Sequence, residues 1–338
     1  MHDFTSDQPG NCSHSAISSN MLFDGPLSTV VIAAGVIGNL YCLRVLFRTS
    51  INTSMLVSLT GLAIWDVVLL IAAFLHHSLW ASLYYFQLRD RSWDPYLVAL
   101  NGLMECAHVT STWMLIEVSA ERFFAVTRPF HFASNMRKQR RESYVRIIGG
   151  MIRMPLIMTL VACLFTLPCS FEYYLEPCLD KGRELLQRQE TTMMRNAVYH
   201  VLYRTIVLSV MKTFGPFVII TLLTVSTVKS LRHSMDNRGT ILMQQGKDHL
   251  FAADKDKTKS LQTISMLLLG KFLLLRCWPT SLEMLRVFFG ENVLSHAPVL
   301  SFDGSEFCLL LNSATNAFVF VVLKSAFETR RNNILQTA

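Results

Sequence analysis

Residues 117–130 read EVSAERFFAVTRPF and close an apolar run that begins at Leu97. Most of this run has the composition of a helix that crosses a lipid bilayer. Glu121 and Arg122 interrupt it, and the apolar character then resumes from Phe123 to Val126. A charged pair inside a membrane helix is costly, so it needs a partner or a function. The stretch therefore predicts a membrane helix whose charged end has a specific task.

The composition of the whole chain also favours a membrane protein. Hydrophobic residues make up 51% and charged residues 16% of the 338 residues, whereas a soluble domain carries about 25% charged residues. A spanning helix needs roughly 20 apolar residues. Seven stretches of this kind occur: Leu27–Phe47, Leu56–Leu75, Leu97–Val126, Val145–Leu167, Val198–Val228, Leu261–Val287 and Val299–Leu323. The prediction is an all-α membrane protein, a seven-transmembrane helix bundle in one domain over residues 27–325.

Basic residues predict the orientation of this bundle. Lys and Arg gather after the third, fifth and seventh stretches, whereas residues 1–26 contain neither. By the positive-inside rule, the N-terminal segment 1–26 lies outside the cell and the C-terminus lies inside. The net charge of +7 then reflects topology and contact with anionic membrane lipid, not binding of nucleic acid.

Each end of the chain carries one further feature. Asn11 begins an Asn-Cys-Ser sequon, which predicts glycosylation on the outer side. In the cytoplasmic segment 326–338, Phe327, Arg331, Ile334 and Leu335 recur at helical spacing. This spacing predicts a short amphipathic helix on the inner membrane surface.

Oxygen-bearing side chains recur near the middle of three stretches. Asp66 lies in the second stretch, Ser111 in the third, and Asn312 and Asn316 in the seventh. An isolated carboxylate at that depth must face the interior of the bundle. These four residues could coordinate a small hard cation through oxygen ligands. The alternative is an ordinary hydrogen-bonded network with water.

A polar stripe runs along the third stretch. Its members step by three or four residues and share one helix face: Glu105, His108, Thr112, Leu115, Ser119 and Arg122. Glu105 and His108 lie in the outer half, where a ligand could enter. Tyr199, Tyr203, Arg204, Trp278 and Glu283 face or approach the same half. Aromatic side chains with a few charges suit a specific ligand site, although each can also serve packing alone.

Charged residues and cysteines supply the remaining candidates. Lys212, Lys271 and Arg276 are unusual at their depths, and the sequence assigns them no partners. Cys169 and Cys178 lie in or near the outward loop after the fourth stretch, where oxidising conditions permit a disulfide. The spacing of the cysteines gives no support for a metal site.

Several motifs, in order and one per helix, resemble those of the rhodopsin-like G-protein-coupled receptors. They are Gly38-Asn39, LAIWD ending at Asp66, Glu121-Arg122-Phe123, Arg128-Pro129, Pro216, Cys277-Trp278-Pro279 and Asn316–Phe320. The resemblance implies that Glu121 holds Arg122 at rest and that Arg122, with Phe123, couples to a heterotrimeric G protein. It also assigns Asp66, Ser111, Asn312 and Asn316 to a possible allosteric sodium site, with no other cofactor.

A looser resemblance narrows the ligand. The stretches LPCSFEYY, TTMMRNAVYHVLYR and LNSATNAF resemble divergent nematode FMRFamide-type neuropeptide receptors. Such a ligand is an amidated peptide with a basic end, for which Glu105, Glu283 and the aromatic side chains offer partners. Glu172 and Glu176 in the outer loop could meet the basic end as well.

The chain departs from the receptor pattern at several positions. Leu97 stands where a cysteine usually begins the third helix, so Cys178 is free or pairs with Cys169 or Cys12. Thr224 replaces an activation tyrosine, and Ala317 and Phe320 replace the expected proline and tyrosine of the seventh helix. These changes leave room for weak or altered signalling.

Two functions follow as predictions. The first is a plasma-membrane, multi-pass receptor for an extracellular neuropeptide. The second is a chemosensory receptor for a small external molecule, which would respond to lipophilic compounds. An enzyme is not expected, because the His and acidic residues form no metal or nucleophile constellation. A retinal pump is not expected either, because Val299–Leu323 contains no lysine for a Schiff base.

Overall fold

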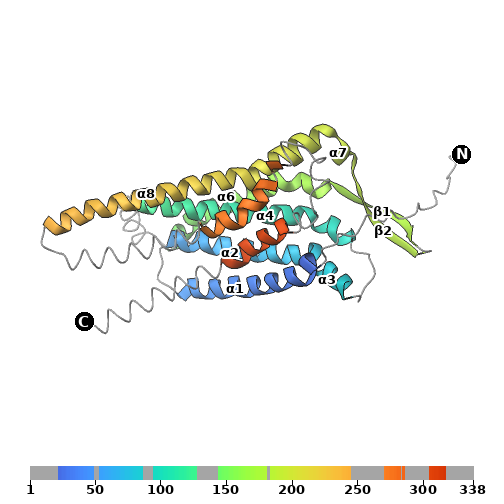
Figure 1. The fold of residues 1–338 in the computed structure, drawn as a ribbon, viewed down its shortest axis with the longest axis horizontal. Coiled ribbons are helices and arrows are strands. Elements are labelled where there is room, and N and C mark those ends of the chain that lie inside the picture. Colours follow the sequence, from blue (N-terminus) through green and yellow to red (C-terminus); the bar gives the residue numbers. More distant parts are fainter. Residues whose placement is uncertain are drawn as a thin grey trace.

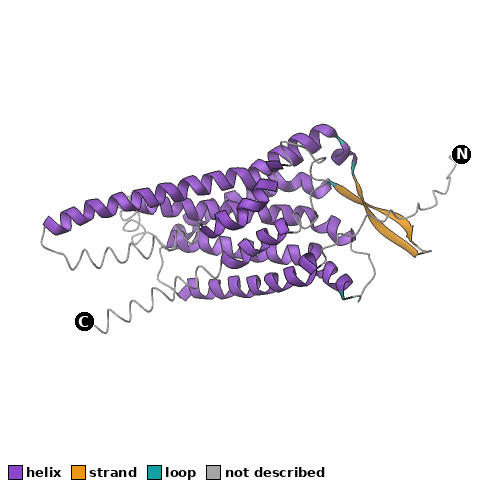
Figure 2. Ribbon diagram, viewed as in Figure 1, coloured by secondary structure: helices purple, strands orange, loops and turns teal. Residues whose placement is uncertain are grey.

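The computed structural model describes residues 22–48, 53–86, 94–127, 144–180, 183–244, 270–282, 284–285 and 304–316. Within these ranges the chain is mostly helical (Figure 2). The helices run roughly along the long direction of the molecule, and two strands project at one end (Figure 1). We call this end the hairpin end.

The regular helices alternate with short segments of other helical type. The α-helices are α1 (Ser28–Arg48), α2 (Thr53–Ala73), α3 (Leu79–Tyr85), α4 (Asp94–Thr127), α6 (Tyr144–Thr166), α7 (Thr192–Arg195) and α8 (Gly215–Gln244). Residues 270–282 and 304–316 are also helical. The π-helical segments are Phe23–Leu27, Phe74–Ser78, Tyr199–Val207 and Val210–Phe214, and Leu167–Phe171 is a 3₁₀ helix.

Four helices are long and apolar enough to cross a membrane: Phe23–Arg48, Leu56–Tyr85, Ile152–Phe171 and Tyr199–Ser230. They overlap the first, second, fourth and fifth predicted stretches, with bounds that differ by up to ten residues, and indicate a multi-pass membrane protein. The helix α4 is not among them, because it carries many polar side chains that the fold buries. The last two stretches lie partly outside the described residues, so a seven-helix bundle remains a prediction.

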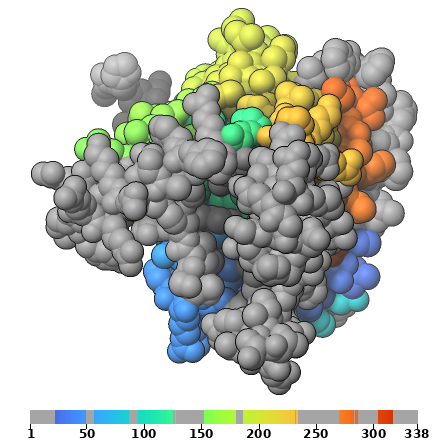
Figure 3. All heavy atoms as spheres, turned by 90° about the vertical axis from the view of Figure 1, so that its left-hand side faces the viewer, coloured from blue at the N-terminus to red at the C-terminus, as the bar shows by residue number. Residues whose placement is uncertain are grey.

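The helix α4 occupies the centre of the described structure and packs against α2, α6 and α8. A core cluster joins α4, α2 and α8 to α1 and to residues 270–282: Cys42, Leu46, Leu59, Leu62, Met114, Leu115, Val118, Ile220 and Phe272. Met158 of α6 packs against this cluster. In the space-filling view along the helices, α8 lies on the opposite side of the molecule from α1 and α2 (Figure 3). Large apolar side chains such as Ile37, Leu156 and Leu222 are exposed on the outer faces, as lipid contact requires.

Pro216 accounts for the irregular start of α8. A proline has no backbone N–H, so it cannot donate to the preceding turn. The segment Val210–Phe214 just before it is π-helical, and the Gly215 N–H donates to the Val210 carbonyl, five residues back. A Cβ atom at residue 215 would lie 2.8 Å from that carbonyl oxygen. Glycine at this position therefore permits the wide turn.

The predicted all-α class is corrected by a β-hairpin. Strand β1 (Tyr173–Asp180) pairs antiparallel with β2 (Arg183–Glu190), so that Tyr173 lies opposite Glu190 and Asp180 opposite Arg183. Arg188 lies over the ring of Tyr173, 4.6 Å from its centre. The strands carry no regular alternation of apolar and polar residues, which is the usual sign of a strand. The hairpin was therefore missed in the sequence, where this region reads as a loop of mixed charge.

Some predictions fall outside the described residues. These are the extracellular segment and its glycosylation site Asn11, the cytoplasmic segment 326–338, and the ligand candidate Glu283. The structure leaves them as predictions.

Candidate functional site

Glu172 is the hub of a polar cluster at the hairpin end. Its side chain is completely buried, directly after the 3₁₀ helix and before β1. One carboxylate oxygen accepts from Tyr199 Oη at 3.1 Å, and the other accepts from Asn101 Nδ2 at 3.2 Å. Arg204 Nη1 lies 3.1 Å from Oε2. Glu172 is therefore buried and paired within the chain, and its contact with the basic end of a peptide stays a prediction.

Glu105 is also occupied by cations of the chain itself. Lys212 Nζ donates to Glu105 Oε2 at 2.8 Å, and Arg204 Nη2 lies 3.5 Å from Oε1. Arg204 thus bridges Glu105 and Glu172. Two acids and two bases balance one another in this cluster, which largely offsets the cost of burying each charge.

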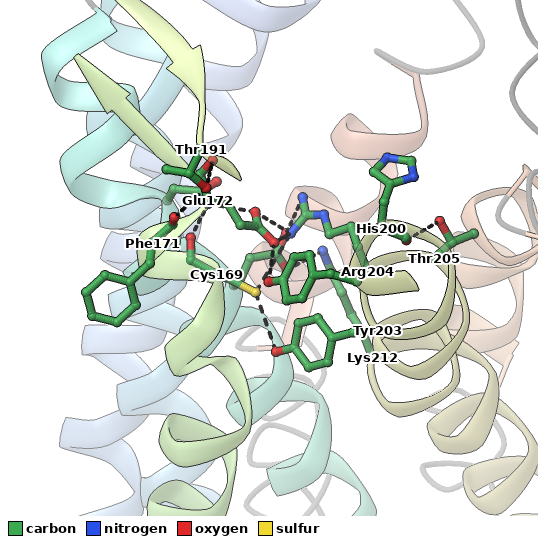
Figure 4. Close-up of polar contacts among 12 residues, drawn as sticks. Cys169, Phe171, Glu172, Thr191, His200, Tyr203, Arg204, Thr205 and Lys212 are labelled. Carbon is green, nitrogen blue, oxygen red and sulfur yellow. Dashed lines mark hydrogen bonds and ion pairs between the residues drawn. The ribbon is translucent and has the colours of Figure 1, made fainter. Parts of the chain in front are cut away.

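The π-helical segment Tyr199–Val207 positions three members of the cluster. Its i→i+5 hydrogen bonds widen the turn, and Tyr199, Tyr203 and Arg204 all reach toward Glu172 and Cys169. The two tyrosine rings stack with centres 5.0 Å apart, and Tyr203 Oη donates to the Phe165 carbonyl at 2.5 Å. Figure 4 shows Tyr203, Arg204 and Lys212 converging on Cys169 and Glu172, whereas His200 points away.

Tyr173 of the neighbouring hairpin also interacts electrostatically with members of this cluster, Arg204 and Glu172. Burial raises the pKa of Tyr173 in β1, and the positive charges of Arg204 and Arg188 act in the opposite direction. Tyr173 should therefore stay protonated at neutral pH.

Four polar residues of α4 share one buried face: Asn101, Glu105, His108 and Thr112. We call them the polar column. Their spacing of four, three and four residues places them above one another along the helix. Asn101 and Glu105 join the cluster just described. Farther from the hairpin, Thr112 accepts a hydrogen bond from Arg276 Nη2 at 2.7 Å, so helix 270–282 meets α4 there.

The predicted cation-site residues converge, but a lysine joins them. Asp66 is completely buried. Its carboxylate accepts from Ser111 Oγ at 2.5 Å and from Asn316 Nδ2 at 2.7 Å. Lys271 Nζ donates to the Asn312 carbonyl at 2.6 Å and also to Asn316 Oδ1. The ammonium of Lys271 therefore contacts two of the four residues, Asn312 and Asn316, that were predicted to hold a cation.

The Glu121-Arg122-Phe123 motif lies in the last turns of α4. Glu121, Arg122 and Phe123 are half-buried there, and the rings of Phe123 and Phe124 meet edge to face at 5.6 Å. One turn earlier, Glu117 is buried and accepts a hydrogen bond from Ser58 of α2 at 3.3 Å. Three charged side chains thus lie within two turns at this end of the helix.

The cysteine expectation is partly corrected. Cys178 in β1 forms a disulfide, but Cys169 is a free, buried thiol, so the two are not joined. Cys169 is instead part of the cluster, with its sulfur 3.8 Å from Tyr203 Oη and 3.8 Å from Arg204 Nη1.

The structure brings together most, but not all, of the predicted ligand residues. Glu105, Tyr199 and Tyr203 meet in the cluster, and His108 lies one turn farther along α4. Trp278 lies on the exposed side of helix 270–282, with 48% of its surface accessible. Sequence reasoning missed Asn101, Glu117 and the hub role of Glu172. An acid placed directly after the apolar run LPCSF was the available signal for Glu172.

Comparison with known protein families and with curated proteins adds no relative. No family model matches the chain, and no curated protein matches it.

Proposed function

We propose that the chain is a G-protein-coupled receptor of the rhodopsin-like kind. In this proposal, seven transmembrane helices lie in the plasma membrane with the N-terminus outside. Binding of a ligand near the hairpin end is transmitted to a heterotrimeric G protein at the other end of the bundle. The first ligand class to test is an amidated, FMRFamide-like neuropeptide.

The observation that carries the proposal is the polar column of α4. It links the charged cluster around Glu105 to Arg276, and the adjacent Ser111 links α4 to Asp66. The same helix ends at Glu121 and Arg122. Buried polar groups inside membrane helices are costly and typically mark functional paths. A receptor needs such a path, because ligand binding must favour one arrangement of helices over another.

A chemosensory receptor for a small external molecule is the second candidate, and one observation favours it. Both buried acids of the cluster are neutralised by Arg204 and Lys212. A cationic peptide would have to displace one of these internal cations, whereas a small neutral or acidic molecule would not. Glu105→Gln separates the two classes, because it should weaken a cationic peptide far more than a neutral ligand.

The test is a calcium response in cells that express the chain with a promiscuous G protein. Amidated Arg-Phe peptides form one pool, and small lipophilic and acidic compounds form the other. Arg122→Ala should abolish the response while surface expression is retained. Arg153→Ala, which changes an exposed arginine of α6, is the matched control and should respond normally. An Arg122→Ala response equal to the wild-type response would overturn the coupling role of this arginine. Silence of the wild-type chain to both pools, with surface expression confirmed, would count against the receptor proposal.

A further inference from the structure

Buried charges along α4 do not balance. Among the described residues between Glu172 and Asp66, the buried or half-buried acids are Glu105, Glu172 and Asp66, and the bases are Arg204, Lys212, Lys271 and Arg276. The cluster accounts for Arg204 and Lys212, and Lys271 lies beside Asp66. Arg276 remains, and no acid among the described residues lies within ion-pair distance of it. Among the residues that the structure describes, one buried positive charge is therefore in excess.

Arg276 also lacks acceptors for most of its N–H groups. It is 4% exposed. Its Nη2 donates to Thr112 Oγ1, but Nε and Nη1 have no hydrogen-bond partner in the described structure. Thr112 offers little more, because its own hydroxyl donates to the His108 carbonyl at 2.9 Å. A guanidinium cannot lose its proton in a protein, so its charge cannot be removed by titration.

His108 adds a second open group at the same place. It is 4% exposed, and its Nε2 atom has no partner among the described residues. Lys212 and Arg276 are the charged groups that act on it electrostatically. His108 and Thr112 lie one turn apart on α4, so the open imidazole and the open guanidinium belong to one region of the bundle.

We propose that this region binds a monovalent anion, held by Arg276 and His108 with Lys212 on the hairpin side. An anion supplies both things that are missing: a negative charge and acceptor lone pairs. Water could satisfy the N–H groups but could not balance the charge. The anion is either an inorganic ion such as chloride or the carboxylate of a ligand that enters from the hairpin end. The site goes beyond the proposed function, because it would hold an anion whether or not the chain couples to a G protein.

The first experiment measures halide binding to the purified full-length chain in detergent. The width of the ³⁵Cl magnetic resonance line is recorded while chloride replaces isethionate at constant sodium concentration. We expect a saturable broadening from bound chloride. If added acetate reverses the broadening, acetate displaces the bound chloride and the site accepts carboxylates as well as halides. If acetate leaves the broadening unchanged, the site binds inorganic anions. No saturable broadening of the chloride line, together with no rise in melting temperature with acetate, would overturn the proposal and leave water as the partner of these donors.

The second experiment links the binding to the named residues. Bromide and acetate should each raise the melting temperature of the wild-type chain to a plateau if they bind there. Arg276→Gln and, separately, His108→Phe should weaken the apparent affinity, Arg276→Gln by at least about tenfold because a charge-assisted hydrogen bond is lost. Arg153→Gln on the exposed face of α6 is the matched control. An unchanged affinity in both site variants would refute the assignment. Neither readout depends on signalling, so a silent receptor would not affect the result.

Discussion

Replacement of Lys271 by methionine should convert a lysine-filled site into a sodium-dependent one. In the wild-type chain, the Lys271 ammonium donates to Asn312 and Asn316, and Asn316 in turn donates to Asp66. Lys271→Met keeps most of the side-chain length but removes the charge. The Asp66 carboxylate would then be a buried anion that keeps its hydrogen bonds from Ser111, Asn316 and Ser313 but has lost the nearby positive charge of Lys271.

Lys271 and Asp66 interact electrostatically through Asn316 and not as a direct ion pair. The cost of about 3–5 kcal/mol for removing one partner of a buried ion pair is therefore an upper bound for this variant. In the variant, a sodium ion could take the place of the ammonium among the oxygen atoms of Asp66, Ser111 and Asn312. At a concentration of about 100 times its dissociation constant, sodium would return about 2.7 kcal/mol of stability. For a domain of a few hundred residues, this amounts to roughly 5–10 °C in melting temperature.

The assay is thermal unfolding in detergent, with sodium chloride compared against choline chloride at equal ionic strength. The wild-type chain should unfold at the same temperature in both salts, whereas Lys271→Met should be stabilised by sodium alone. Lys229→Met, which alters an exposed lysine of α8, is the matched control. A double variant with Asp66→Asn should lose the sodium effect. Equal sodium dependence of the wild-type chain and Lys271→Met would refute the reasoning that the ammonium occupies the cation position.

Two further predictions concern the hairpin end. Glu105→Gln should destabilise the chain by about 3–5 kcal/mol in thermal unfolding, because the half-buried Lys212 loses the one acid among the described residues with which it forms an ion pair. The double variant with Lys212→Met should recover much of this loss, and additive losses would argue against a direct pair. Cys178→Ser should lower the free energy of unfolding by about 2–4 kcal/mol through loss of its disulfide. Cys169→Ser should leave that disulfide intact on non-reducing peptide maps, and its disappearance there would contradict the assignment.

The sequence predicted where helices lie along the chain, but it did not predict which helices contact one another. Composition and length suffice to find a membrane helix, so α1, α2 and α6 lie close to their predicted bounds. Helical spacing likewise places Glu105, His108 and Thr112 on one face of α4. The partners of Glu105 could not be predicted, because Lys212 lies 107 residues away along the chain. Spacing along one helix carries no information about which other helix it meets.

The position of Lys271 next to the predicted cation-site residues could not be predicted from the sequence either. Oxygen-bearing side chains predicted a site for a positive charge, and such a charge is present, but a side chain supplies it. Helix 270–282 had to be placed against Asp66 before this could be seen. The β-hairpin could not be predicted from its own sequence. Pro177 in β1 and the charged residues of β2 interrupt the alternation of apolar and polar residues that indicates a strand.

The pair between Glu105 and Lys212 has a consequence for how the protein is made. Glu105 leaves the ribosome 107 residues before the lysine that neutralises it, which corresponds to about 5–20 s of synthesis. Throughout that interval α4 carries a carboxylate without its later partner, and the insertion machinery gains little by releasing such a helix into lipid. On the prediction that α4 spans the bilayer, we expect it to wait at the translocon until the segment Tyr199–Ser230 emerges, so that the two helices enter the bilayer together.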